Sequence, residues 1–116
     1  MIMMGCVYMY KINDSSKVAE IINNSRMSVV YFTGMDCGAC EVIKFKVEEI
    51  LKKYDKIVAC EINGEKHRDI CAEYGVFSVP IFLLFIDGKE SIRIGRNVDL
   101  LDLESKMDRY YNMIFN

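Results

Sequence analysis

The chain has 116 residues, a length that suits one domain with its own hydrophobic core. An apolar fraction of 52% and a charged fraction of 28% are typical of a soluble globular protein. The net charge of -2, without a patch of either sign, argues against nucleic acid or an anionic membrane surface as a partner.

The N-terminal residues do not resemble a targeting signal. Only five residues precede Cys6 and none of them is basic, so the segment is too short for a signal peptide or a lipoprotein leader. No apolar stretch approaches the length of a membrane span. We therefore expect residues 1–116 to form a single domain in the cytoplasm.

Three elements are predicted in the first third of the chain. Residues 6–10 favour an outer strand, because they include a valine and two tyrosines. Asn13 to Ser16 offer helix-capping side chains, and apolar residues then recur at helical spacing up to about Ser25. Val29 to Phe32 is apolar on both faces, which is typical of a central strand that is covered on both sides.

A pair of cysteines follows this strand. After a break at residues 34–36 comes Cys37-Gly38-Ala39-Cys40, and an amphipathic helical pattern begins at once. Two cysteines three positions apart at the start of a helix form a dithiol suited to redox chemistry. The helix N-terminus favours an anion, here the Cys37 thiolate, which is the nucleophile in disulfide exchange. Cys40 lies about one turn further along and can attack a mixed disulfide held on Cys37.

The second half of the chain continues the alternation of strands and helices. A strand is predicted over residues 57–62, and a short helix over residues 67–74 is followed by a glycine stop. A buried strand over residues 81–86 leads into an Asp-Gly hairpin turn and a return strand, and Asp99 caps a last helix. The order β-α-β-α-β-α-β-β-α predicts an α/β fold with a mixed sheet of about five strands and helices on both faces.

This order, with the cysteine pair at the first turn of the second helix, resembles the thioredoxin family. The segment from Tyr74 to Pro80 is similar to the family's Tyr-Gly-Val-x-x-Val/Ile-Pro segment, Phe85 and Gly88 match its hairpin, and Gly95 matches a glycine after its last strand. The resemblance covers nearly the whole chain and implies the thioredoxin fold.

The resemblance also implies a substrate-binding segment. In the family the proline is cis and lies beside the cysteine pair, and Pro80 is the matching residue here. We expect the backbone of Val79 to face Cys37 and to bind an extended segment of substrate as an added strand.

The chain departs from the family's usual Trp-Cys-Gly-Pro-Cys-Lys motif at three positions, because Asp36, Ala39 and Glu41 replace Trp, Pro and Lys. Asp36 and Glu41 bring negative charge close to Cys37, so we expect a smaller thiolate population than in thioredoxins of the usual sequence. Ala39 beside Gly38 should change the redox poise only modestly. Without the tryptophan, substrate recognition has to rely on Met35, Phe77, Val79 and the loop around Gly95.

A larger departure concerns the residues behind the pair. Thioredoxins usually carry a buried Asp six residues before the first cysteine and a Lys on the next strand, and we match these positions to Tyr31 and Cys60. Tyrosine titrates at about pH 10, so Tyr31 is a poor base at neutral pH, although it can donate a hydrogen bond. We therefore expect slow attack by Cys40. Cys60 is then a candidate third redox thiol behind the pair.

The remaining thiols have a simpler interpretation. The five cysteines cannot all pair within the chain, which argues against the disulfide scaffold of a secreted domain. Cys60 and Cys71 lie in apolar patterns and are expected to act as small buried hydrophobic residues. The ten residues between these two do not form a zinc knuckle, so we expect neither zinc nor an iron–sulfur cluster. His67 is expected to be a solvated surface residue.

The sequence therefore predicts a thiol–disulfide oxidoreductase that reduces or exchanges protein disulfides, with attack by Cys37, resolution by Cys40 and no cofactor. The resemblance implies a thioredoxin-reductase-like flavoprotein as electron donor, and we expect a monomer. Asp36, Tyr31 and Glu41 favour an alternative, in which the chain is a thioredoxin-fold binding or adaptor module with weak redox activity toward one partner.

Overall fold

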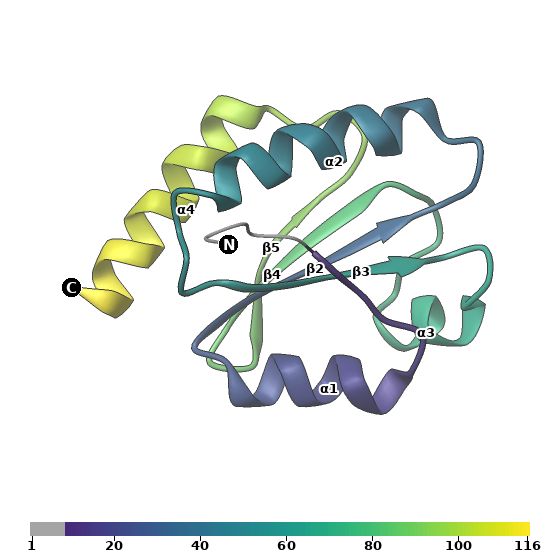
Figure 1. Cartoon of the computed structure of the whole chain (residues 1–116), viewed down its shortest axis with the longest axis horizontal. Coiled ribbons are helices and arrows are strands. Elements are labelled where there is room, and N and C mark those ends of the chain that lie inside the picture. Colours follow the sequence, from purple (N-terminus) through teal and green to yellow (C-terminus); the bar gives the residue numbers. More distant parts are fainter. Residues whose placement is uncertain (1–8) are drawn as a thin grey trace, which may run out of the picture.

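A mixed five-stranded sheet forms the centre of the molecule (Figure 1). The computed structural model describes residues 9–116. The strand order is β1-β3-β2-β4-β5, in which β2 pairs with β3 in parallel and with β4 in antiparallel orientation. The strands are β1 (Tyr10–Lys11), β2 (Met27–Thr33), β3 (Val58–Asn63), β4 (Ile81–Ile86) and β5 (Lys89–Ile94). The predicted element order and mixed sheet are confirmed, although Cys6 and much of the predicted first strand lie outside the described residues.

Helices cover both faces of the sheet (Figure 1). On one face lie α1 (Ser15–Asn24) and α3 (Arg68–Glu73), and on the other lie α2 (Gly38–Leu51) and α4 (Leu100–Phe115). Each face has its own hydrophobic core, and alternate residues of β2 contribute to the two cores. Tyr31 packs on the side of α2, whereas Val30 and Phe32 pack on the side of α1. This double coverage explains why β2 is buried along its whole length.

Local side chains fix the ends of these elements. Asp14 and Asp99 cap α1 and α4, and each carboxylate accepts a hydrogen bond from a backbone N–H in the first turn. Gly75 ends α3 with a left-handed φ of 65°. Asp87 and Gly88 both have left-handed φ angles, 49° and 83°, which suit a two-residue hairpin turn. Asp99, Gly75 and the turn at residues 87–88 are at the predicted positions, and Asp14 is one of the four capping residues predicted over residues 13–16.

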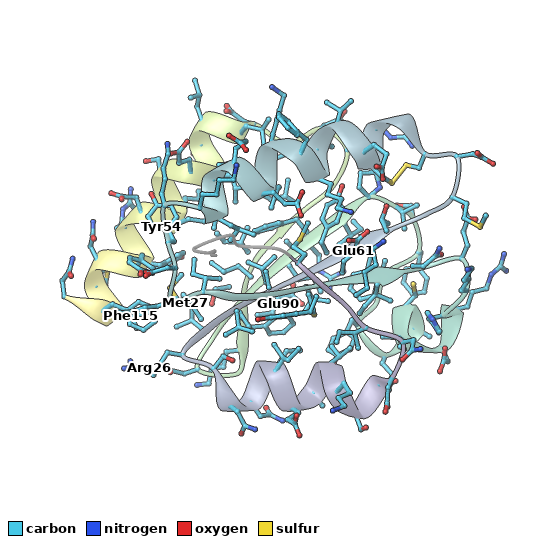
Figure 2. All side chains as sticks on the ribbon, viewed as in Figure 1. Arg26, Met27, Tyr54, Glu61, Glu90 and Phe115 are labelled. Carbon is cyan, nitrogen blue, oxygen red and sulfur yellow. A yellow bond between two sulfur atoms is a disulfide. The ribbon has the colours of Figure 1, made fainter. Side chains whose placement is uncertain are left out.

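Aromatic rings join the far ends of α2 and α4. The ring centroids of Tyr54 and Tyr111 are 5.0 Å apart, and those of Tyr111 and Phe115 are 4.8 Å apart. Figure 2 shows Tyr54 and Phe115 at this end of the molecule, away from the N-terminus of α2. Within residues 9–116, no helix combines the length and the apolar character needed to cross a lipid bilayer.

Candidate active site

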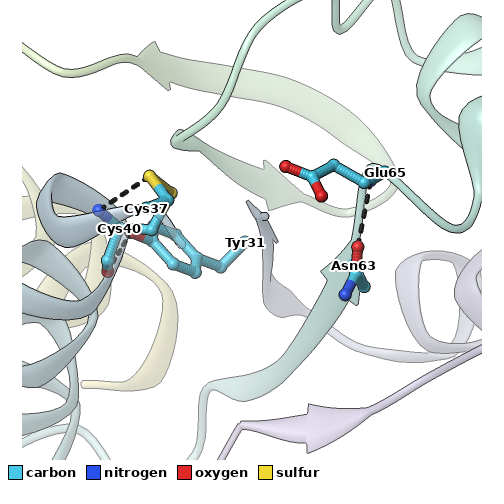
Figure 3. Close-up of a disulfide and its surroundings, with 5 residues drawn as sticks. All are labelled: Tyr31, Cys37, Cys40, Asn63 and Glu65. Carbon is cyan, nitrogen blue, oxygen red and sulfur yellow. Dashed lines mark hydrogen bonds between the residues drawn. A yellow bond between two sulfur atoms is a disulfide. The ribbon is translucent and has the colours of Figure 1, made fainter. Parts of the chain in front are cut away.

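The two cysteines of the motif are joined by a disulfide at the N-terminus of α2 (Figure 3). Cys37 is the half-buried N-cap residue, and its Sγ accepts a hydrogen bond from the backbone N–H of Cys40 at 3.2 Å. Cys40 is fully buried. A partner can therefore reach only the sulfur of Cys37, and the helix N–H is already placed to stabilise a thiolate there.

Acidic and apolar side chains surround the half-buried Cys37. A surface hollow beside Cys37 is lined by Gly34, Met35, Asp36, Cys37, Gly38 and Glu41. The side chains of Asp36 and Glu41 are exposed, and Met35 is 56% exposed. The negative charge that the sequence predicts next to Cys37 is therefore present at its rim. Ala39 is half-buried within the first turn of α2.

A further carboxylate, which the sequence interpretation missed, approaches from the loop after β3. Figure 3 shows Glu65 across from the disulfide, with its carboxylate directed toward the side of the cysteine pair. Asn63 holds this loop, because its Oδ1 accepts hydrogen bonds from the backbone N–H groups of Glu65 and Lys66 at 3.0 and 3.2 Å. The site thus carries acidic groups on two sides.

The cis-proline segment packs against the loop that leads to Cys37. The Val79–Pro80 peptide bond is cis, as the family resemblance implies. A Cβ added at Gly34 would lie only 3.0 Å from the side chain of Val79, and a Cβ added at Gly95 would lie 3.7 Å from the carbonyl oxygen of Pro80. The fold therefore brings four of the predicted site regions together: the Cys37 loop, Val79, Pro80 and Gly95.

A groove extends from this segment over α3. It has a volume of about 390 Å³ and is lined by Gly64, Glu65, Arg68, Cys71, Ala72, Val76, Phe77, Ser78 and Val79. Phe77 is 90% exposed, so its ring is available to a partner at no cost to the hydrophobic core. The surface beside Cys37 therefore combines an extended backbone with two exposed apolar side chains, Met35 and Phe77.

Tyr31 lies directly behind the pair. Its side chain is fully buried, and its hydroxyl donates a hydrogen bond to the carbonyl oxygen of Cys40 at 2.8 Å. Burial raises the pKa of Tyr31 well above its usual value, and the nearby charges of Glu61 and Glu41 raise it further. The predicted role as a hydrogen-bond donor is therefore confirmed, and the phenol stays protonated at neutral pH.

The prediction that Cys60 lies behind the pair is wrong. Cys60 packs in the core between the sheet and α1, on the opposite face from Tyr31. Burial raises the pKa of its thiol to about 12, so it is an inert core residue. The residue in register with Tyr31 is Glu61. Because side chains alternate along a strand, a difference of one residue places the side chain on the other face.

An ion pair that the sequence interpretation missed occupies that position. Glu61 is only 7% exposed, and its Oε1 lies 3.0 Å from the Nζ of Lys44, one turn beyond Cys40 on α2. Partial burial opposes the charge on Lys44, but Glu61, with Glu48 and Glu41, outweighs this effect and raises the pKa of Lys44. A charged residue inside a strand that is apolar on both faces was the available signal.

The two other residues considered from the sequence, Cys71 and His67, lie within α3 and at its N-terminus. Cys71 is buried, and its thiol donates to the carbonyl oxygen of Gly64 at 3.6 Å. Burial raises the pKa of Cys71, with Asp69 adding to this effect and Arg68 opposing it. His67 is half-buried and precedes α3. In the part of the chain from Met9 onward, no three His, Cys, Asp or Glu side chains gather in a metal-binding group.

Comparisons with known proteins give a consistent result. A family model described as Thioredoxin matches residues 9–109. The thioredoxin-like protein YdfQ of Bacillus subtilis is 29% identical, with 83% of this chain and 86% of the relative covered. The thioredoxin of Griffithsia pacifica is 31% identical, with 84% of this chain and 90% of the relative covered. A mutant thioredoxin from Halobacterium salinarum shares the fold, with a TM-score of 0.81 at 19% identity over 91% of this chain and 93% of that chain. The oxidised thioredoxin from Plasmodium falciparum also shares the fold, with a TM-score of 0.78 at 20% identity over 90% of this chain and 99% of that chain.

Proposed function

Because the chain belongs to the thioredoxin family and is a protein-disulfide oxidoreductase, we propose that it reduces disulfides of partner proteins through its Cys-Gly-Ala-Cys motif. The observation that carries the proposal is the unequal burial of the two bonded sulfurs. Cys37 is accessible at a helix N-terminus, whereas Cys40 is sealed beneath it. This asymmetry supports one attacking and one resolving thiol.

In the proposed reaction the Cys37 thiolate attacks one sulfur of the partner's disulfide. A bond forms between Cys37 and that sulfur, and the other partner sulfur leaves as a thiolate. Cys40 then attacks the Sγ of Cys37, and the second partner sulfur leaves as the Cys37–Cys40 disulfide closes. Two electrons pass from the pair to the partner. The reaction needs no metal or organic cofactor, because the two sulfurs carry both electrons.

The surface around Cys37 supports binding of an extended partner segment. The backbone of Val79, before the cis proline, is available to pair with such a segment as an added strand. Gly95 leaves room for it beside Pro80, and Met35 and Phe77 offer exposed apolar contacts. We propose that these residues recognise the partner in place of the missing tryptophan.

The proposal extends to the cellular setting. A thioredoxin-reductase-like flavoprotein would return electrons to the Cys37–Cys40 disulfide. The protein would act as a monomer in the cytoplasm, where a reducing environment favours reduction of partner disulfides. Asp36, Glu41 and Glu65 around the sulfur would favour partner segments that are not acidic.

Turnover of insulin with dithiothreitol as the electron donor tests this function. We expect the protein to accelerate insulin precipitation over dithiothreitol alone, and the Cys37→Ser variant to lose the acceleration. The Cys6→Ser variant is the matched control, because it removes a thiol outside the pair. Activity that survives Cys37→Ser, or no acceleration by the wild-type protein, would contradict the proposal.

The alternative is an adaptor module with weak redox activity toward one partner. The acidic rim of Asp36 and Glu41 supports it, because negative charge disfavours the thiolate on Cys37. The same insulin assay decides between the two functions. An adaptor would bind its partner through Met35 and Phe77 with insulin reduction no faster than with dithiothreitol alone.

A further inference from the structure

We propose that Glu61 is the proton acceptor for the resolving thiol of Cys40, with Lys44 positioning its carboxylate. The inference rests on the proposed function, since a resolving thiol exists only if Cys37 first forms a mixed disulfide. Cys40 is fully buried, and its thiol must lose a proton to become a nucleophile. A group near the buried end of the site therefore has to take that proton.

Tyr31 of β2 and Glu61 of β3 both contact α2, at Cys40 and Lys44 respectively, and only Glu61 can act as a base. The Tyr31 hydroxyl donates to the Cys40 carbonyl oxygen, and the raised pKa of Tyr31 keeps it protonated. Glu61 lies opposite Tyr31 in the register of β2 and β3. Among the residues that the structure describes, Glu61 is the only buried carboxylate.

The carboxylate of Glu61 lies in the same layer as Cys40. Lys44 follows Cys40 by four residues, so the two side chains are on the same side of α2. The 3.0 Å contact between Lys44 and Glu61 therefore ties the carboxylate to the part of the helix that carries Cys40. Figure 2 shows Glu61 between the sheet and α2.

A polar hollow connects Glu61 to the surface. It has a volume of about 420 Å³ and is lined by Lys11, Ile12, Asn13, Thr33, Glu61, Asn63, Lys66 and His67. Within residues 9–116, the Thr33 Oγ1 and the Glu61 Oε1 are buried without a protein hydrogen bond, although Lys44 contacts that oxygen as an ion pair. A polar hollow of this size admits water. A proton on Glu61 therefore has a route to bulk solvent that does not cross the partner-binding surface.

The proposed step moves one proton from the Cys40 thiol and exchanges one disulfide bond for another. In the mixed disulfide, Glu61 takes the proton of the Cys40 thiol through an intervening water molecule. The Cys40 sulfur attacks the Sγ of Cys37, and a bond forms between them as the bond from Cys37 to the partner breaks. The partner sulfur leaves with the electron pair as a thiolate. Glu61 then releases its proton through the hollow.

Several other titratable groups surround the ion pair of Lys44 and Glu61. Tyr31 faces it from β2, Glu41 and Glu48 act on Lys44 from α2, and the hollow adds Lys11, Lys66 and His67. His67, the one histidine of the 116-residue sequence, lines the same hollow as Glu61. The pH dependence of resolution is therefore measured in the His67→Gln background as well as in the wild-type background.

The reaction of the reduced protein with 5,5′-dithiobis(2-nitrobenzoate) separates the two steps in a stopped-flow experiment. The first thionitrobenzoate released reports attack by Cys37, and the second reports resolution by Cys40. A Cys6→Ser background is used, and Cys60 and Cys71 are buried. We expect Glu61→Gln to slow the second phase by about tenfold or more and to leave the first phase unchanged. Glu20→Gln on α1 is the matched control.

The direction of the effect separates a proton acceptor from a merely structural charge. If Glu61 were only a buried negative charge, its removal would ease formation of the Cys40 thiolate and would accelerate the second phase. We expect instead a slower second phase, with partial rescue by Glu61→Asp. In Lys44→Met the pH midpoint of the second phase should move upward, because the lone carboxylate holds its proton to higher pH.

The double variant with Glu61→Gln and Lys44→Met controls for misfolding, because it leaves no unpaired buried charge. We expect it to fold and to resolve slowly. An unchanged or faster second phase in this variant or in Glu61→Gln would overturn the inference. Loss of the first phase in the wild-type protein would instead contradict the proposed function.

Discussion

Replacing Tyr31 by Phe removes a single hydroxyl from the buried side of the active site. The phenylalanine ring fills the same space, so the variant creates almost no cavity. The bond to the Cys40 carbonyl oxygen, at 2.8 Å, is lost, but that carbonyl can keep its acceptor bond within α2. The net loss of one such hydrogen bond is about 1 kcal/mol.

This loss corresponds to about a fivefold change in the folding equilibrium. With a typical urea dependence for a small domain, the midpoint of urea unfolding should fall by about 0.5 M. Insulin reduction should stay close to that of the wild-type protein, because the raised pKa of Tyr31 prevents it from acting as a base. Tyr54→Phe is the matched control, since it removes a hydroxyl that donates to Asp108 at 3.0 Å, far from the cysteines.

Two outcomes would refute this reasoning. A stability loss of about 3 kcal/mol or more would mean that the hydroxyl supports more than one hydrogen bond. A large fall in insulin reduction, with Tyr54→Phe unaffected, would mean that Tyr31 takes part in proton transfer. In that case Glu61 would not be the acceptor.

Three further predictions concern the groove, the buried thiol and the active-site loop. Phe77→Ala should raise the KM for insulin without changing thermal stability. Met113 is also an exposed apolar residue but lies on α4, so Met113→Ala should change neither the KM nor the thermal stability. Burial raises the pKa of Cys60 from 9.0 to about 12, so its contribution to stability is complete below pH 9 and is lost as the pH rises toward 12. The urea midpoint of the wild-type protein should therefore fall more steeply above pH 9 than that of Cys60→Ala, and parallel curves would contradict this. Gly34→Ala should lower kcat/KM for insulin, because its Cβ would lie 2.9 Å from the Glu65 carboxylate and 3.0 Å from the Val79 side chain and would displace both. A normal kcat/KM would show that this packing is not needed.

Local sequence patterns were sufficient to predict most of the fold. The strand over residues 81–86, the turn at Asp87 and the cap Asp99 were predicted at the residues where they occur, and the cap of α1 was predicted within residues 13–16. Each depends on side chains within a few residues of one another, so no tertiary information is needed. The cis bond before Pro80 was predicted only through the family resemblance.

The composition of the buried site could not be predicted in the same way. Assigning Cys60 to the position behind the pair required the register between β2 and β3, and that register depends on packing of the whole sheet. Glu61 interrupts an apolar strand, but Lys44 is 17 positions away in the sequence and no local pattern links the two residues. Their contact is visible only when α2 lies on the sheet.

The unequal burial of the two cysteines also has a consequence for oxidative damage. Hydrogen peroxide can reach the half-buried Cys37 sulfur but not the sealed Cys40 sulfur. A sulfenic acid formed on Cys37 would therefore meet a thiol one helical turn away and close to a disulfide before a second oxidant arrives. The fold thus gives this chain a recoverable oxidation product in place of an irreversible sulfinic acid.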